Sequence, residues 1–145
     1  MRFFEKTGQM AIGSRVRLLG DIITRDAAEI YRAYGTDLQP KWFPVFYLLT
    51  KHGENSVTSI AEEIGHSHVS VSKIVAEMSK VGLITEKSDT KDRRRTKVGL
   101  SKKGREISRK IEEQYADVGS AIEEISAQAK HNLWAAIGEW ETLLN

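Results

Sequence analysis

The chain has 145 residues, of which 40% are hydrophobic and 29% are charged, a globular composition that excludes an intrinsically disordered protein. It contains no cysteine, which excludes disulfides, thiolate zinc sites and cysteine nucleophiles. The net charge of +2 hides an uneven distribution, because residues 87–105 carry nine basic and two acidic side chains whereas residues 106–145 carry three basic and eight acidic ones.

Hydrophobic periodicity predicts that most of the chain is helical. Apolar residues recur every three or four positions from Ile12 to Tyr34, which predicts one helix from Phe4 to about Tyr34 with a single buried stripe. A short apolar helix is expected from Trp42 to Leu49, with Pro44 in its first turn, where proline is tolerated.

Two more helices are predicted on either side of a sharp turn. Val57–Ile64 forms the first, Gly65 ends it, and Ser67 caps a second helix that closes at Gly82. Ala61 is small enough for the two helices to pack closely, and this arrangement is a helix-turn-helix. The predicted shared core of the pair consists of Ile64, Val71, Ile74 and Val75.

The pattern then changes to two short strands, 83–87 and 96–100. After them Ser101 is expected to cap a helix that runs through Ile125, and a last helix is expected from Ser126 to about Leu144. We therefore expect a mainly α fold with a small β-hairpin wing.

The second helix of the pair is predicted to leave a small, polar face outside the core. No acidic residue lies between Gly65 and Glu77, as a helix that approaches DNA phosphates and base edges requires. Serines and a lysine also decorate many ordinary exposed helices. The predicted DNA-contacting residues of this helix are Ser67, His68, Val69, Ser70, Ser72 and Lys73.

An arginine-rich turn between the two strands strengthens the DNA-binding interpretation. Arginine is favoured in narrow minor grooves, and Asp92 lies two residues before Arg94, where it could orient that guanidinium. The alternative is an irregular charged loop. The predicted DNA contacts of the wing are Lys91, Asp92, Arg93, Arg94 and Arg95.

The apolar residues of the chain ends favour a homodimer. They repeat at helical spacing from Ile107 to Leu144 and include Trp134 and Trp140. A single small lobe cannot easily bury all of these apolar residues and the apolar stripe of the first helix as well, so a partner chain is expected to cover them. Two-fold symmetry would then require a pseudo-palindromic site on double-stranded DNA, with half-sites roughly 34 Å apart.

From turn to wing the sequence resembles the MarR family of bacterial winged-helix regulators. The resemblance covers 64–67, 71–75, 80–84, Asp92–Arg94 and 98–104, with Ser101 where threonine is commoner and His68 where a small residue or proline is frequent. It implies a single domain over 1–145, with a DNA-binding lobe at about 40–100 and dimerisation helices at about 4–34 and 101–144. Arg94 would be the minor-groove arginine and Asp92 its support.

The resemblance also implies repression as the commoner outcome and release by a small organic ligand. Such a ligand would occupy a cavity between dimer helices and lobe, although aromatic residues at helical spacing are more often plain core. The wall residues suggested are Arg15, with Arg17 as an alternative anion partner, and Tyr31, Tyr34, Trp42, Phe46 and Tyr47.

Other classes are less well supported by the sequence. We expect no enzyme, no catalytic residue, no cofactor and no metal site, because there is no phosphate loop, no paired-histidine motif and no nucleophile–base set. The N-terminus lacks a secretory signal and no apolar run is long enough to span a membrane, so a cytoplasmic protein is expected. The alternative is an interaction domain acting through protein contacts, because 3–8 and 40–46 resemble MarR-type domains that precede GNAT-type acetyltransferase domains in longer proteins.

Overall fold

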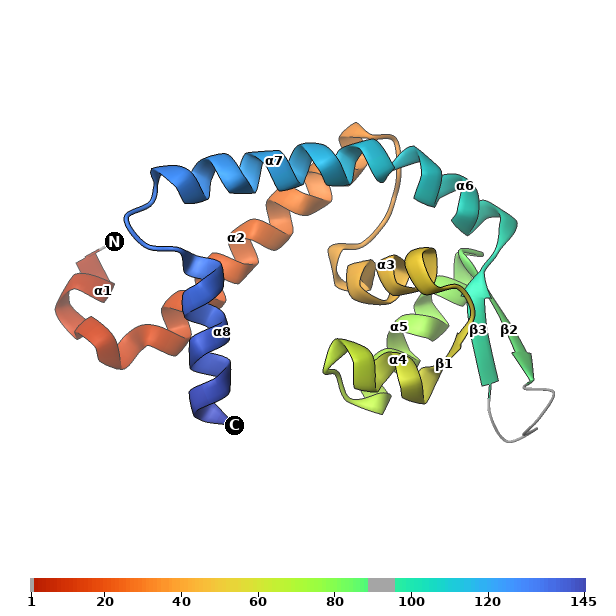
Figure 1. Ribbon diagram of the computed structural model, residues 1–145, viewed down its shortest axis with the longest axis horizontal. Helices are drawn as coiled ribbons and strands as arrows, with labels where there is room; N and C mark the ends of the chain where they lie inside the picture. Colours follow the sequence, from red (N-terminus) through yellow and green to blue (C-terminus); the bar gives the residue numbers. More distant parts are fainter. Residues whose placement is uncertain (1, 89–95) are drawn as a thin grey trace. The chain divides into compact units, whose positions relative to one another are not determined.

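The computed structural model describes residues 2–88 and 96–145 and consists of two units, Met1–Arg109 and Lys110–Asn145. Figure 1 shows the elements in chain order. The helices of the first unit are α1 (Arg2–Thr7), α2 (Ile12–Ala33), α3 (Phe43–His52), α4 (Val57–Ile64), α5 (His68–Lys80) and α6 (Lys102–Lys110, whose last residue falls in the second unit), with 3-10 turns η1 (Gly8–Ala11) and η2 (Pro40–Trp42). Its strands are β1 (Asn55–Ser56), β2 (Ile84–Ser88) and β3 (Thr96–Leu100), and the second unit holds α7 (Glu112–Gln128) and α8 (Leu133–Leu144).

The three strands form one antiparallel sheet in the order β1-β3-β2. Ile84 pairs with Leu100 and Ser88 with Thr96, so β2 and β3 form the predicted hairpin. The mainly α fold with a small wing is confirmed. The sheet differs from the prediction in having a third strand, since Asn55 pairs with Val98 and Ser56 with Lys97. Two residues are too short a run for an alternating pattern to reveal.

The core of the lobe lies between α3, α4, α5 and the sheet. Each helix contributes one apolar face, and Val98 of β3 is fully buried against them. Burial of these side chains stabilises the lobe by about 25 cal/mol per Å² of apolar surface. The buried residues of the three helices are Val45, Phe46, Leu48, Leu49, Ile60, Ala61, Val71, Ile74, Val75 and Met78. Ile64, which was predicted to share this core, is only half-buried.

The prediction of one helix from Phe4 to Tyr34 is wrong in its first third. Gly8 has φ +60°, a left-handed conformation that glycine adopts without strain, and it separates α1 from α2 through the 3-10 turn η1. No apolar residue lies between Phe4 and Met10, so the apolar spacing begins only after this break and the sequence does carry a signal of it.

The C-terminal helices also differ from the prediction. The helix expected from Ser101 to Ile125 is two helices that meet at Ile111, where the backbone has φ −98° and ψ 3°. The last helix begins at Leu133 rather than at Ser126, because α7 continues through Gln128 and Asn132 caps α8 by accepting the Ala135 N–H at 3.1 Å. Serine and asparagine are about equally good N-caps, so the sequence alone did not select between the two positions.

No helix in the described ranges combines the length and the apolar character that crossing a membrane requires.

Candidate nucleic-acid interface

Serine caps and a left-handed glycine set the geometry of the α4–α5 pair. Ser56 Oγ accepts the Ser59 N–H at 3.1 Å at the start of α4, and Ser67 Oγ accepts the Ser70 N–H at 3.2 Å at the start of α5. Between the helices Gly65 has φ +67° and ψ 28°, as predicted for the sharp turn. Three residues thus separate the end of α4 from the start of α5, which is the spacing of a helix-turn-helix.

The outward face of α5 contains some of the predicted contact residues and two that sequence reasoning missed. Val69 is 78% exposed, and Lys73 is exposed one turn further along. Ala76 and Lys80 continue the same face at helical spacing, and this periodicity could have identified them. Ser67 and His68 are also exposed, whereas Ser70 and Ser72 are half-buried.

Beside this face lies a hollow of about 330 Å³ between α5, the start of α4 and the wing strands. His68 and Ser72 line it from α5, and their Nδ1 and Oγ atoms are 3.4 Å apart. Glu86 of β2 and Thr96 of β3 line it from the wing, and neither was predicted. The predicted α5 residues therefore divide into an outward group and a group that faces the base of the wing.

The predicted wing contacts Lys91, Asp92, Arg93, Arg94 and Arg95 lie outside the described residues. On either side of this segment, Ser88 of β2 is the register partner of Thr96 of β3.

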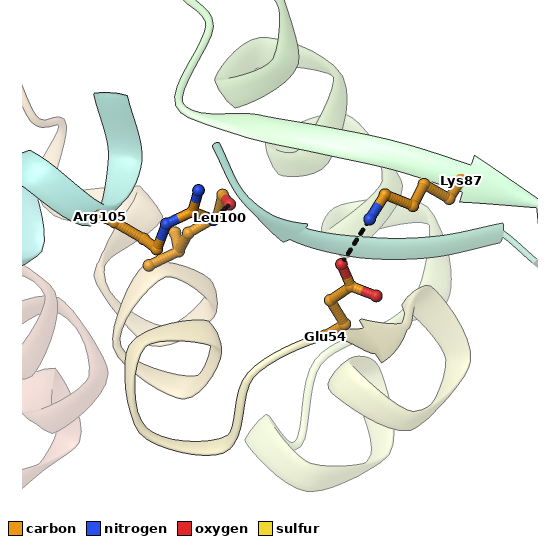
Figure 2. Close-up of polar contacts among 4 residues, drawn as sticks. All are labelled: Glu54, Lys87, Leu100 and Arg105. Atoms are coloured by element: carbon orange, nitrogen blue, oxygen red, sulfur yellow. Dashed lines mark hydrogen bonds and ion pairs between the residues drawn. The ribbon is translucent and has the colours of Figure 1, made fainter. Parts of the chain in front are cut away.

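An ion pair ties the wing strand β2 to the segment that precedes α4. Lys87 Nζ lies 2.9 Å from Glu54 Oε1, and the contact passes over β3 at Gly99 (Figure 2). A Cβ atom at Gly99 would lie 2.6 Å from Glu54 Cγ, so glycine leaves the space for this crossing. The hydrogen bond and the charge of Lys87 lower the pKa of Glu54 below its usual range.

A second set of contacts joins the wing to the end of α5 through Ser101. Its hydroxyl accepts the Gly104 N–H at 3.0 Å, as predicted for the cap of α6, and donates to Gly82 O at 2.6 Å. Its backbone N–H donates to Leu83 O at 2.9 Å, and Lys103 Nζ donates to Val81 O at 2.7 Å. These contacts join the end of the hairpin at Ile84 and Leu100 to the end of α5, whereas the Glu54–Lys87 pair joins β2 to the segment before α4.

Comparison with known proteins agrees with this geometry. Residues 36–95, which contain the helix-turn-helix and β2, match the family model described as MarR family. This segment is a MarR-family domain. The match leaves the helices on either side of it outside, and a search of curated proteins gave no match.

Solved structures share the winged-helix fold over most of the chain at low identity. MepR of Staphylococcus aureus, solved as a DNA complex, is 15% identical with a TM-score of 0.70, covering 92% of this chain and 95% of its own. The MarR family regulator NMB1585 of Neisseria meningitidis is 17% identical with a TM-score of 0.61, covering 99% and 92%. PcaV of Streptomyces coelicolor, solved with its natural ligand, is 15% identical with a TM-score of 0.62, covering 87% and 88%.

The residues suggested as ligand walls have different environments, and three of them, Trp42, Phe46 and Tyr47, lie within the matched segment. Phe46 is 1% exposed and lies in the core, and Tyr31 and Trp42 are also buried. Trp42 lines a hollow of about 340 Å³ with Leu38 and Lys103. Tyr34 is half-buried, and Tyr47 is exposed beside Phe43, with the two ring centroids 5.4 Å apart. Arg15 and Arg17 are both exposed, and the Arg15 guanidinium lies 5.8 Å from the centre of the Phe4 ring. As for metals, the described parts of the chain hold no group of three His, Asp or Glu side chains placed to share an ion.

Glu77 anchors α5 of the MarR-family segment to η2. Its Oε2 lies 2.6 Å from Lys41 Nζ and accepts the indole N–H of Trp42 at 2.8 Å. The pKa of Glu77 lies below its ordinary value of 4.5, mainly because of the hydrogen bond from Lys41 and next because of the hydrogen bond from Trp42.

We expect this anchor to make stability depend on acid pH. A carboxylate whose pKa is lowered by folding stabilises the native state above its unfolded pKa, and this contribution disappears as the pH falls through the lower folded pKa. Glu77→Gln should therefore lower the urea midpoint at neutral pH, and its difference from the wild type should shrink below pH 4.5. Glu62→Gln removes an exposed carboxylate from α4 and is the control for the loss of one negative charge. A Glu77→Gln deficit that stays constant down to low pH would show that lost packing, not lost charge, explains it.

Proposed function

We propose that this chain is a homodimeric, sequence-specific DNA-binding repressor that reads a pseudo-palindromic operator through α5 and the wing. The observation that carries the proposal is the acid-free outward face of α5, with Val69 and Lys73 exposed on a helix capped by Ser67. A helix with such a surface can enter the major groove without repelling the phosphates. The structural relative MepR was solved bound to DNA, which supports the same role for this lobe.

In this proposal the chain acts as one MarR-like domain over 1–145, with its DNA-binding lobe at about 40–100. The apolar residues that α2 and α8 leave exposed support dimerisation helices at about 4–34 and 101–144. On α2 the exposed apolar residues Ile12, Val16, Leu19 and Ile23 follow 4-3-4 spacing, and on α8 Leu133, Ile137, Trp140 and Leu144 do the same. Stripes of this spacing are typical of helix–helix interfaces, and a second copy of the chain is the proposed partner.

The proposed dimer is released from DNA by a small organic ligand. The hollow beside Trp42 is within the size range of small-molecule sites, and PcaV was solved with its natural ligand.

The decisive experiment is selection from a random duplex library with the purified chain at two salt concentrations. The proposal predicts enrichment of a palindrome whose half-sites lie about one helical turn apart, with affinity that falls as salt rises. Failure to enrich any sequence, even at low salt, would favour a domain that acts through protein contacts.

Lys73→Ala should weaken operator binding because Lys73 is exposed at the centre of the outward face of α5. If the ammonium contacts only phosphate, affinity should fall similarly on all sequences and the salt slope should drop by about 1. Titration of operator and scrambled duplex at several salt concentrations measures both quantities. A loss confined to the operator would instead assign Lys73 to a base.

Arg94→Ala should weaken operator binding about tenfold or more and leave the dimer intact, since the wing guanidinium is proposed to enter a minor groove. Fluorescence anisotropy with the selected operator gives the affinity, and sedimentation gives the oligomeric state. Unchanged affinity in a folded variant would remove the wing from the mechanism.

A further inference from the structure

A hollow of about 540 Å³ lies between the end of α3 and α6, and all its lining residues belong to the first unit. It takes no part in the proposed contacts with DNA, because α5 contributes no residue to its wall. Its volume is in the range of small-molecule sites. Three kinds of side chain line it, and each restricts the chemistry of an occupant.

Two arginines supply positive charge. Arg105 and Arg109 lie one turn apart on α6 and both line the hollow. Arg105 Nη1 donates to Leu100 O at 2.6 Å, which holds this guanidinium beside the end of β3 (Figure 2). Arg109 Nε donates to Arg105 O at 3.3 Å. Within the described ranges neither forms an ion pair, so several N–H groups of each remain for a carboxylate.

Three further groups of the lining are placed to accept hydrogen bonds from an occupant. Thr50 Oγ1 donates its proton to Phe46 O at 2.9 Å, and Ser108 Oγ donates to Arg105 O at 3.0 Å. Both hydroxyls therefore offer lone pairs, not protons, to the hollow. Glu54 adds a carboxylate, of which Oε1 is bound to Lys87.

The remaining wall is apolar. Leu49, only 2% exposed, and Leu100, which is half-buried, also line the hollow. If an inorganic anion occupied the hollow, the apolar surface of Leu49 and Leu100 and the hydrogen-bond acceptors would both be left without a partner.

We propose that this hollow binds a zwitterionic α-amino acid with an apolar side chain. The carboxylate is held by Arg105 and Arg109, the ammonium by Thr50, Ser108 and Glu54, and the side chain lies on Leu49 and Leu100. No DNA contact is required, so the proposal can fail or succeed independently of the operator-reading function.

The test uses the full chain, labelled with ¹⁵N, and three probes that share one phenylethyl skeleton. L-Phenylalanine carries both charges, 3-phenylpropionate lacks the ammonium, and phenethylamine lacks the carboxylate. We expect L-phenylalanine to shift the amide signals of Gly53 and Ser108, and each probe with one charge to bind about tenfold more weakly or worse. Shifts centred instead on Gly35–Leu38 would place the ligand in the other hollow and overturn the proposal.

Two variants and a control assign the contacts. Arg109→Gln should weaken L-phenylalanine and 3-phenylpropionate about tenfold, whereas Thr50→Val, nearly equal in volume, should weaken L-phenylalanine and leave 3-phenylpropionate unchanged. Lys102→Gln removes a positive charge from an exposed position of the same helix and should change neither. No binding at about 10 mM L-phenylalanine, equal binding of all three probes, or wild-type affinity in Arg109→Gln would each refute the proposal.

Discussion

Gly104→Ala is expected to lower the free energy of unfolding by about 3 kcal/mol, in the upper part of the range for overpacked sites. A Cβ atom at Gly104 would lie 2.1 Å from Leu83 O, a backbone atom that cannot move aside as a flexible side chain would. Leu83 O also accepts the Ser101 N–H at 2.9 Å, so displacing it disturbs the junction between wing and α6. Urea denaturation at a fixed protein concentration measures the change.

Gly119→Ala is the matched control for this substitution. Gly119 lies in α7, and outside its own helix backbone no described atom lies within 4 Å of the position that a Cβ would take, so alanine should leave stability unchanged or raise it by about 1 kcal/mol through helix propensity. If Gly104→Ala proved as stable as Gly119→Ala, α6 would have to start further from Leu83 than the structure places it.

Trp140→Glu is expected to separate the proposed dimer and to reduce operator affinity about a hundredfold or more. Trp140 is 54% exposed on the apolar stripe of α8, and a carboxylate there would have to lose its hydration on association. Two lobes that bind one operator gain from their high effective concentration, and separate lobes lose that gain. Sedimentation velocity and anisotropy on the selected operator measure the two effects.

The control is Thr142→Glu, which adds the same charge to α8 two residues away, on the opposite side of the helix from Trp140. It should preserve both the dimer and the affinity. A Trp140→Glu chain that remained dimeric would remove this stripe from the interface. A Trp140→Glu chain that became monomeric but kept full affinity would show that a single lobe is enough to bind the operator.

The parts of the fold with local causes were predicted from the sequence. The start of α5 follows from the cap at Ser67, the end of α4 from Gly65, and the β3 boundaries from the alternation at 96–100. Each of these signals lies within a few residues of the feature that it specifies.

Features that depend on contacts distant in the sequence were missed. β1 exists because Asn55 and Ser56 pair with residues more than 40 positions later, and no local pattern marks a two-residue strand. In the candidate site, Glu86 lines the hollow beside α5 only because β2 folds back toward that helix. The division of the predicted α5 residues into an outward group and a wing-facing group depends on the same packing.

The pairing of β1 with β3 affects how much variation in DNA the lobe can tolerate. Ser56 is both a residue of β1, which pairs with β3 of the wing, and the N-cap of α4. The first helix of the helix-turn-helix is therefore joined directly to the wing sheet through this residue. Tilting α4 against the wing would break either the strand pairing or the cap. In the proposed dimer each lobe would thus measure a fixed length of DNA, and a changed distance between half-sites would have to be met by movement between the two lobes.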